Sequence, residues 1–118
     1  MLRALIPLSS VKSVPRSIEF YQKLGFRVRN TVNADGASEP TWASLHSDGA
    51  ELMIGRAKEP ADTSQKPVLF YLYCDDVVAK REELVRAGIA AGPMQYPFYS
   101  PGGEFRVEDP DGYEIWIT

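Results

Sequence analysis

The sequence has little of several features that mark particular protein classes. It contains one cysteine, Cys74, and one histidine, His46, among 118 residues. A single cysteine excludes an internal disulfide and favours a cytoplasmic location, and a lone histidine is a poor basis for a metal site. Thirteen basic residues against sixteen acidic ones give a net charge of −3. Nucleic acid is therefore not an expected partner, because binding it requires a basic surface.

Long apolar runs are also missing. No run approaches the ~18 residues that a membrane-spanning helix needs, so we expect no association with a membrane. Residues 1–8 are too short and too interrupted by proline for a signal peptide. The length and a hydrophobic content of 44% favour one globular domain over residues 1–118.

A turn and its earlier copy organise the chain. The DPDG segment at residues 109–112 is typical of a tight turn, because proline presets φ and glycine adopts positive φ. The apolar runs on either side predict a hairpin. The SDGA segment at residues 47–50 is a weaker copy (112 − 49 = 63), and KLGF at 23–26 matches RAGI at 86–89 with the same spacing (88 − 25 = 63). One supersecondary unit is therefore predicted to occur twice.

Each copy is predicted to form a strand, a helix and three further strands. The first has a strand at 3–8, a helix from Pro15 to Gly25 with Ser13 as its N-cap, a strand at 27–32, a loop at 33–40 and a hairpin at 42–46 and 50–54. The second has a strand at 68–74, a helix capped by Asp76 and ended by Gly88, a segment at 90–103 without a clear pattern, and the last hairpin. The first module spans about 1–56, the linker 57–67 and the second module about 68–118.

These elements predict an α+β fold built from two βαβββ modules. Each module would form a four-stranded sheet with a helix on its outer face. The two sheets would pair as half-barrels around a concave pocket, whose walls are the faces without helices. Whether the modules pair within one chain or between chains stays open.

Two stretches, from Arg16 to Phe26 and the turn at 109–113, resemble the vicinal oxygen chelate superfamily, which includes glyoxalase I, extradiol dioxygenases and bleomycin resistance proteins. The resemblance spans essentially the whole chain and implies the doubled module and a homodimer whose pockets draw on both chains. The GGEF segment at 102–105 is similar to the bleomycin resistance type, although Pro101 stands where that group has a tryptophan.

In enzymes of this superfamily four side chains bind a divalent metal, one from the first and one from the last strand of each module. The resemblance places Ile6, Met53, Leu69 and Trp116 at these positions, and the repeat gives the same pairs (69 − 6 = 63; 116 − 53 = 63). None of the four supplies a histidine nitrogen or a carboxylate oxygen, and a methionine thioether is a soft, weak ligand. We therefore expect no metal and no cofactor.

The same four positions are predicted to line the pocket, together with three aromatic residues. Counting back across each turn puts Trp42 opposite Met53 and Phe105 opposite Trp116, and Tyr71 alternates with Leu69 on one face. An aromatic groove without charge suits a flat or amphipathic ligand. The predicted ligand-binding residues are Ile6, Trp42, Met53, Leu69, Tyr71, Phe105 and Trp116.

Two glutamates also fall on these faces. Glu51 and Glu114 are repeat mates and could act as an acid and a base in one cleft, or they could be ordinary charges at the solvent rim. Asp76, with Asp75 before it, is interpreted as a helix cap and not as part of a metal pair, and Cys74 as a small buried residue.

The predicted function is metal-free binding of an aromatic or amphipathic small molecule, with no catalytic residue assigned. The alternative is a lyase, isomerase or dioxygenase that uses displaced ligands such as His46, Glu51 or Glu114. Metal analysis of the purified protein distinguishes these two hypotheses. A third is a degenerate paralogue with a structural or regulatory role, expected if the protein's own side chains fill the pocket.

Overall fold

The structure, a computed structural model, describes residues 1–58 and 68–118, so most of the predicted linker at 57–67 lies outside the described residues. The chain divides into two compact units, Met1–Ala61 and Asp62–Thr118. We refer to them as the first and the second unit.

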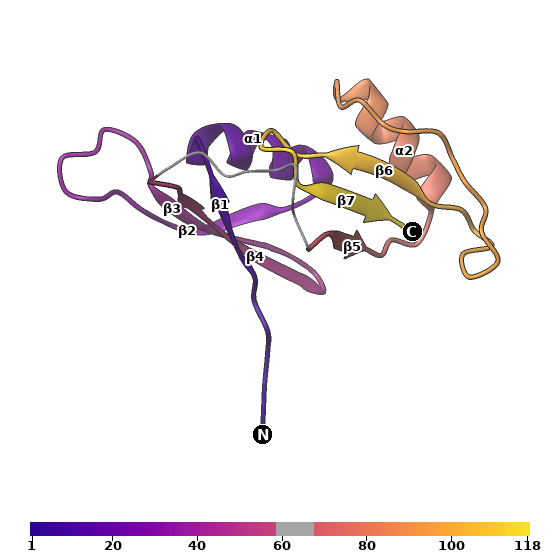
Figure 1. The fold of residues 1–118 in the computed structure, drawn as a ribbon, viewed down its shortest axis with the longest axis horizontal. Helices are drawn as coiled ribbons and strands as arrows, with labels where there is room; N and C mark the ends of the chain where they lie inside the picture. The colour runs from indigo at the N-terminus through magenta and orange to yellow at the C-terminus, as the bar shows by residue number, and fades with distance from the viewer. Residues whose placement is uncertain (59–67) are drawn as a thin grey trace. The chain divides into compact units, whose positions relative to one another are not determined.

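The first unit is a four-stranded sheet with one helix packed on it (Figure 1). Its elements in chain order are β1 (Leu8–Val11), α1 (Val14–Leu24), β2 (Arg27–Val32), β3 (Trp42–Ser47) and β4 (Ala50–Arg56). The strand order is β1-β4-β3-β2, in which β1 runs parallel to β4 and the other neighbours are antiparallel.

α1 begins and ends where its sequence predicts. Ser13 Oγ accepts a hydrogen bond from Arg16 N at 3.3 Å, which satisfies one of the free N–H groups of the first turn. Gly25 adopts a φ of 119° at the C-terminal end, where glycine meets the least steric resistance. The helix packs against β2, β3 and β4. Its buried residues are Val14, Ser17, Tyr21 and Leu24.

β1 begins later than predicted, at residue 8 and not at residue 3. Pro7 accounts for the difference. Its carbonyl accepts a hydrogen bond from Met53 N at 2.9 Å, but its nitrogen has no hydrogen to donate, so the ladder starts here. The residues before it extend away from the first sheet as an exposed arm (Figure 1).

The second unit repeats the plan with a smaller sheet. Its elements are β5 (Phe70–Leu72), α2 (Val77–Arg86), β6 (Phe105–Glu108) and β7 (Glu114–Ile117), and the strand order is β5-β7-β6. The parallel pair β5–β7 corresponds to β1–β4 in the first unit. α2 is capped by Asp76, whose Oδ1 accepts from Ala79 N at 3.0 Å, and Gly88 follows its end with a φ of 87°.

The fourth strand predicted for the second sheet is absent within residues 68–118. The segment beside β6 makes one isolated antiparallel bridge, Gln95 with Glu104, and a hydrogen bond from Gly92 N to Arg106 O at 2.8 Å. Pro93 and Pro97 lack the N–H group that a regular ladder needs, which limits the pairing to these contacts.

The two hairpins differ in the length of their turns. In the first, Ser47 pairs with Ala50 across two residues. In the second, Glu108 pairs with Glu114 across five residues, 109–113. The difference of three is odd, and side chains alternate between the faces of a strand. A residue of β6 therefore faces the opposite side of its sheet from the β3 residue that lies 63 positions earlier in the sequence.

Asp109 holds the longer turn. Its Oδ1 accepts hydrogen bonds from Asp111 N at 2.8 Å and from Tyr113 N at 2.9 Å, and Gly112 takes a φ of 87°. The sequence predicted both features, an aspartate that hydrogen-bonds the backbone of the turn and a glycine with positive φ.

The predicted fold class is confirmed: the protein is α+β, with two small open sheets and a helix in each unit. None of the helices in the described parts of the chain is long and apolar enough to cross a membrane.

Candidate ligand-binding site

The first sheet has a face that packs under α1 and an open face. Alternate residues of β1, β3 and β4 are buried toward the helix: Ser9, Val11, Ala43, Leu45, Leu52 and Ile54. Their neighbours along each strand point to the open face. There Leu8 lies in register with Met53, and Met53 with Ser44. Leu8 is 57% exposed and Met53 is half-buried.

Trp42 lies on the same open face, one row further along. The predicted pairing of Trp42 with Met53 is wrong, because Trp42 pairs with Gly55. The predicted partner differs from the observed one by two residues, and side chains two apart point the same way, so Trp42 still lies on the predicted face. A Cβ placed on Gly55 would lie 3.6 Å from Leu8 Cδ1 and 3.9 Å from Trp42 Cδ1, so both side chains lie over this glycine. Leu8, Trp42 and Met53 form an apolar patch, which we call the first patch.

The second sheet carries a corresponding row on its open face. Tyr71, Trp116 and Arg106 are directly in register across β5, β7 and β6. Tyr71 is 47% exposed and Trp116 is half-buried. Tyr71 and Trp116 are the repeat mates of Leu8 and Met53 (71 − 8 = 63; 116 − 53 = 63). We call this row the second patch.

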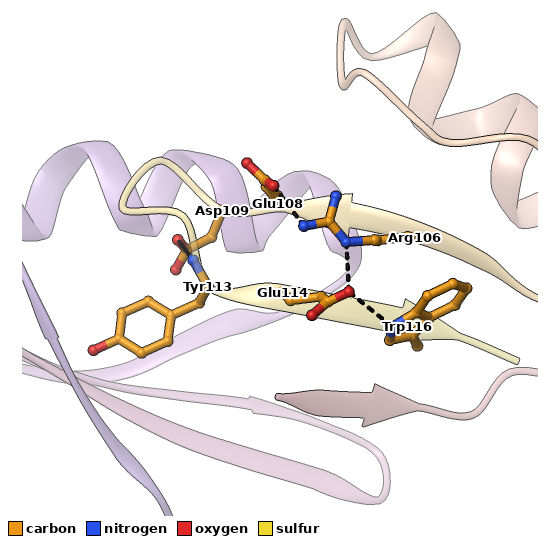
Figure 2. A network of polar contacts seen from close by, with 6 residues as sticks. All are labelled: Arg106, Glu108, Asp109, Tyr113, Glu114 and Trp116. Carbon is orange, nitrogen blue, oxygen red and sulfur yellow. Dashed lines mark hydrogen bonds and ion pairs between the residues drawn. The ribbon is translucent and has the colours of Figure 1, made fainter. Parts of the chain in front are cut away.

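Glu114 holds the edge of the Trp116 indole. Its Oε1 accepts a hydrogen bond from Trp116 Nε1 at 3.2 Å and one from Arg106 Nε at 2.6 Å (Figure 2). Arg106 also donates through Nη2 to Glu108 Oε1 at 2.6 Å. The hydrogen bonds to Glu108 and Glu114 raise the pKa of Arg106. The network fixes the indole through its Nε1 edge, and the two ring faces take no part in the hydrogen bonds.

Residues 97–103 fold onto the end of the second sheet beyond this row. The hydroxyl of Tyr99 donates to Glu104 Oε1 at 2.8 Å, and the hydroxyl oxygens of Ser100 and Thr118 are 2.6 Å apart. The hydrogen bond to Glu104 is the main cause that raises the pKa of Tyr99, with smaller contributions from burial and from the charges of Glu104 and Tyr71. Tyr99 therefore remains a hydrogen-bond donor at neutral pH.

Phe105 does not share the face of Trp116, contrary to the predicted register. It pairs with Ile117, and Arg106 takes the position opposite Trp116. The longer turn shifts the pairing by one residue, which moves Phe105 to the other face of the sheet. Its side chain is 0% exposed, in the core of the second unit.

Ile6 and Leu69 lie just before β1 and β5, which begin at Leu8 and Phe70, although the sequence predicted both residues within these strands. They are 38% and 42% exposed, and the residues in register with the last strand of each sheet are Leu8 and Tyr71. Leu8 was missed because the first strand was placed too early. Pro7 was the available signal, since a proline marks the place where a ladder can begin.

The two rows do not fit a divalent metal. The first offers Leu8 and Met53, and the second offers Tyr71 and Trp116, whose indole N–H donates and cannot ligate. In residues 1–58 and 68–118, no three His, Cys, Asp or Glu side chains gather in a way that could hold a metal ion.

The two glutamates considered as an acid and a base are each paired with an arginine of their own unit. Arg29 Nη1 lies 3.2 Å from Glu51 Oε1, and Arg106 Nε lies 2.6 Å from Glu114 Oε1. These contacts favour the interpretation as rim charges. Burial raises the pKa of Cys74, which makes its thiol a poor nucleophile at neutral pH.

The strand order within each unit and the repetition of the plan agree with a known family. The sequence profile of the Glyoxalase family, described as the Glyoxalase/Bleomycin resistance protein/Dioxygenase superfamily, matches residues 7–117. The chain belongs to this family. No functionally curated protein matches the sequence.

Solved structures of similar proteins share the fold at low sequence identity. SMU.1112c is 24% identical with a TM-score of 0.79, over 99% of this chain and 98% of that one. A bleomycin-binding protein complexed with bleomycin is 18% identical with a TM-score of 0.73, over 98% and 97%. A bleomycin resistance determinant encoded on the transposon Tn5 is 18% identical with a TM-score of 0.75, over 98% and 96%. At these identities the similarity establishes the fold alone.

Proposed function

We propose that this member of the glyoxalase and bleomycin resistance family binds an aromatic or amphipathic small molecule, without metal chemistry of its own, in the cytoplasm. The observation that carries the proposal is the second patch. From the sequence, Trp116 is expected at a position where the family's enzymes have a metal ligand. Glu114 accepts a hydrogen bond from its indole at 3.2 Å. An aromatic ring held in one orientation is a platform for stacking a flat ligand.

The energetics favour a fixed platform over a mobile one. Binding costs free energy when side chains must be ordered, and a ring that is already held avoids much of this cost. Each stacking contact on an aromatic side chain contributes about 1–3 kcal/mol. The first patch supplies apolar area of the same kind. The solved relative that is complexed with bleomycin lends support, because that protein shares this fold.

Replacing Trp116 with alanine is expected to weaken binding of a neutral, flat probe by about 1–3 kcal/mol, because the stacking platform is removed. Anthracenemethanol is a suitable probe, and bleomycin is a second one. Fluorescence anisotropy of the anthracene gives the dissociation constant and does not depend on the protein's tryptophans.

Val85→Ala is the matched control, because Val85 is 49% exposed on α2 and lies outside both patches. It should bind the probe as the wild-type protein does. Equal affinity of the Trp116→Ala and wild-type proteins, or failure of the wild-type protein to bind either probe, would contradict the proposed function.

We also propose that the protein is a homodimer whose sites draw on both chains. The open faces expose large apolar side chains, including Leu8 at 57%, Val32 at 53% and Tyr71 at 47%, and exposed apolar patches mark interaction surfaces. Sedimentation equilibrium at micromolar concentration should give twice 13.2 kDa, or 26.4 kDa. A single species of 13.2 kDa would refute the dimer.

A further inference from the structure

Glu104 differs from the other carboxylates on the open face of the second sheet. Glu108 and Glu114 both pair with Arg106, each at 2.6 Å. Within the described ranges, Glu104 has no ion pair with a lysine, arginine or histidine, although it is only 3% exposed. Strand alternation places it on the same face as Arg106, at the end covered by residues 97–103.

One oxygen of this carboxylate has no partner. Oε1 accepts the hydrogen bond from the Tyr99 hydroxyl. Oε2 is buried and no donor of the described residues reaches it. Buried polar atoms are nearly always hydrogen-bonded in folded proteins, and an unsatisfied carboxylate oxygen carries a desolvation penalty. Such an oxygen is free to accept a hydrogen bond from a donor outside the chain.

The surroundings of Glu104 are aromatic. Tyr99 donates a hydrogen bond to it, and Tyr71 is close enough to raise the pKa of the Tyr99 hydroxyl. Trp116 is in register with Tyr71 on the same face. Aromatic faces attract organic cations through their negative ring surface, and an anionic group would be repelled by the carboxylate. Tyr99 is 59% exposed, so its ring has room to move aside.

We propose that Glu104 is the charged anchor of the ligand site, which takes a protonated primary or secondary amine carried on an aromatic ring system. The ammonium group would donate to Oε2 once the ring of Tyr99 moves aside, and the aromatic part would stack on the second patch. This inference rests on the proposed function and narrows its ligand class. A metal ion is not the expected occupant, because a single carboxylate cannot supply the several ligands that a cation such as Ca²⁺ or Mg²⁺ takes.

The test uses three probes with the same ring and different charge: aminomethylanthracene, anthracenemethanol and anthracenecarboxylate. Fluorescence anisotropy at neutral pH gives three dissociation constants for the full-length protein. The amine is expected to bind about 10–100-fold more tightly than the alcohol, as a charge-assisted hydrogen bond implies, and the carboxylate more weakly than the alcohol.

Glu104→Gln should reduce this preference for the amine to about twofold or less, with affinity for the alcohol unchanged. Glutamine keeps the shape of the side chain and an oxygen that accepts from Tyr99. Glu82→Gln is the control, because it removes the same charge from an exposed position on α2 that belongs to neither patch. It should keep the preference. Tyr99→Phe should keep it too, since the carboxylate remains, and it tests the inference even if Glu104→Gln unfolds.

The outcomes separate the two proposals. If none of the three probes binds, the proposed function fails. If the alcohol binds and the amine binds no better, the aromatic platform stands and the role of Glu104 is refuted. An amine preference that Glu104→Gln retains, or that Glu82→Gln or Tyr99→Phe abolishes, would equally refute it.

Discussion

Replacing Phe105 with alanine is expected to lower the free energy of unfolding by about 3–5 kcal/mol. Phe105 is 0% exposed, and its register partner Ile117 is also buried. Removing a large aromatic side chain from such a site leaves a cavity that the neighbours fill only in part. Urea unfolding monitored by circular dichroism gives the change directly.

Tyr71→Ala is the comparison for this prediction, because Tyr71 is in the same sheet but is 47% exposed on the open face. Its stability loss should be well below that of Phe105→Ala, while its binding of a flat probe should fall. If Phe105→Ala instead unfolded like the wild-type protein and lost ligand binding, Phe105 would belong to the binding site, as the sequence had predicted.

Gly103→Ala is expected to destabilise the protein by about 1–3 kcal/mol, the usual cost of forcing a residue with a Cβ into a left-handed conformation. Gly103 has a φ of 100°, and a Cβ there would lie 2.3 Å from Met94 Cε and 3.0 Å from Tyr96 Cε1. The methionine end is flexible and can move, so most of the cost comes from the backbone. Thermal and urea unfolding measure it.

Gly102→Ala is a control one residue away. A Cβ at Gly102 meets nothing within 4 Å and its φ lies outside the left-handed range, so the substitution should be neutral or slightly stabilising. Equal losses at Gly102 and Gly103 would indicate that the effect is general to the loop and does not come from the conformation of Gly103.

Local signals in the sequence predicted the local structure well. Ser13 and Gly25 fixed the two ends of α1, and the predicted strand at 27–32 coincides with β2. These features depend on a few neighbouring residues, such as a cap that accepts one hydrogen bond or a glycine that adopts positive φ. The fold class followed from the same signals and from the repeat.

The site was harder to predict because it depends on pairing between strands. Counting across a turn requires its exact length, and the similarity between residues 47–50 and 109–112 concealed the longer turn of the second hairpin. Phe105 was therefore assigned to the wrong face. Glu104 was missed for a different reason: a glutamate beside a strand is usually exposed, and its contacts with Gln95 and Tyr99 arise from a segment without a clear sequence pattern.

The difference in turn length means that the two halves of this duplicated chain have diverged by more than substitution. Trp42 on the open face has the buried Phe105 as its repeat mate (105 − 42 = 63), and the buried Leu45 has the exposed Glu108 (108 − 45 = 63). The register shows how the sheet absorbs this change: Ser44 pairs with Met53 and Arg106 with Trp116, so β3 and β6 correspond at a spacing of 62 (106 − 44 = 62), and the buried Ala43 and Leu45 match the buried Phe105 and Val107. One extra residue was therefore accommodated within the turn itself, and the strand before it kept its inner and outer faces.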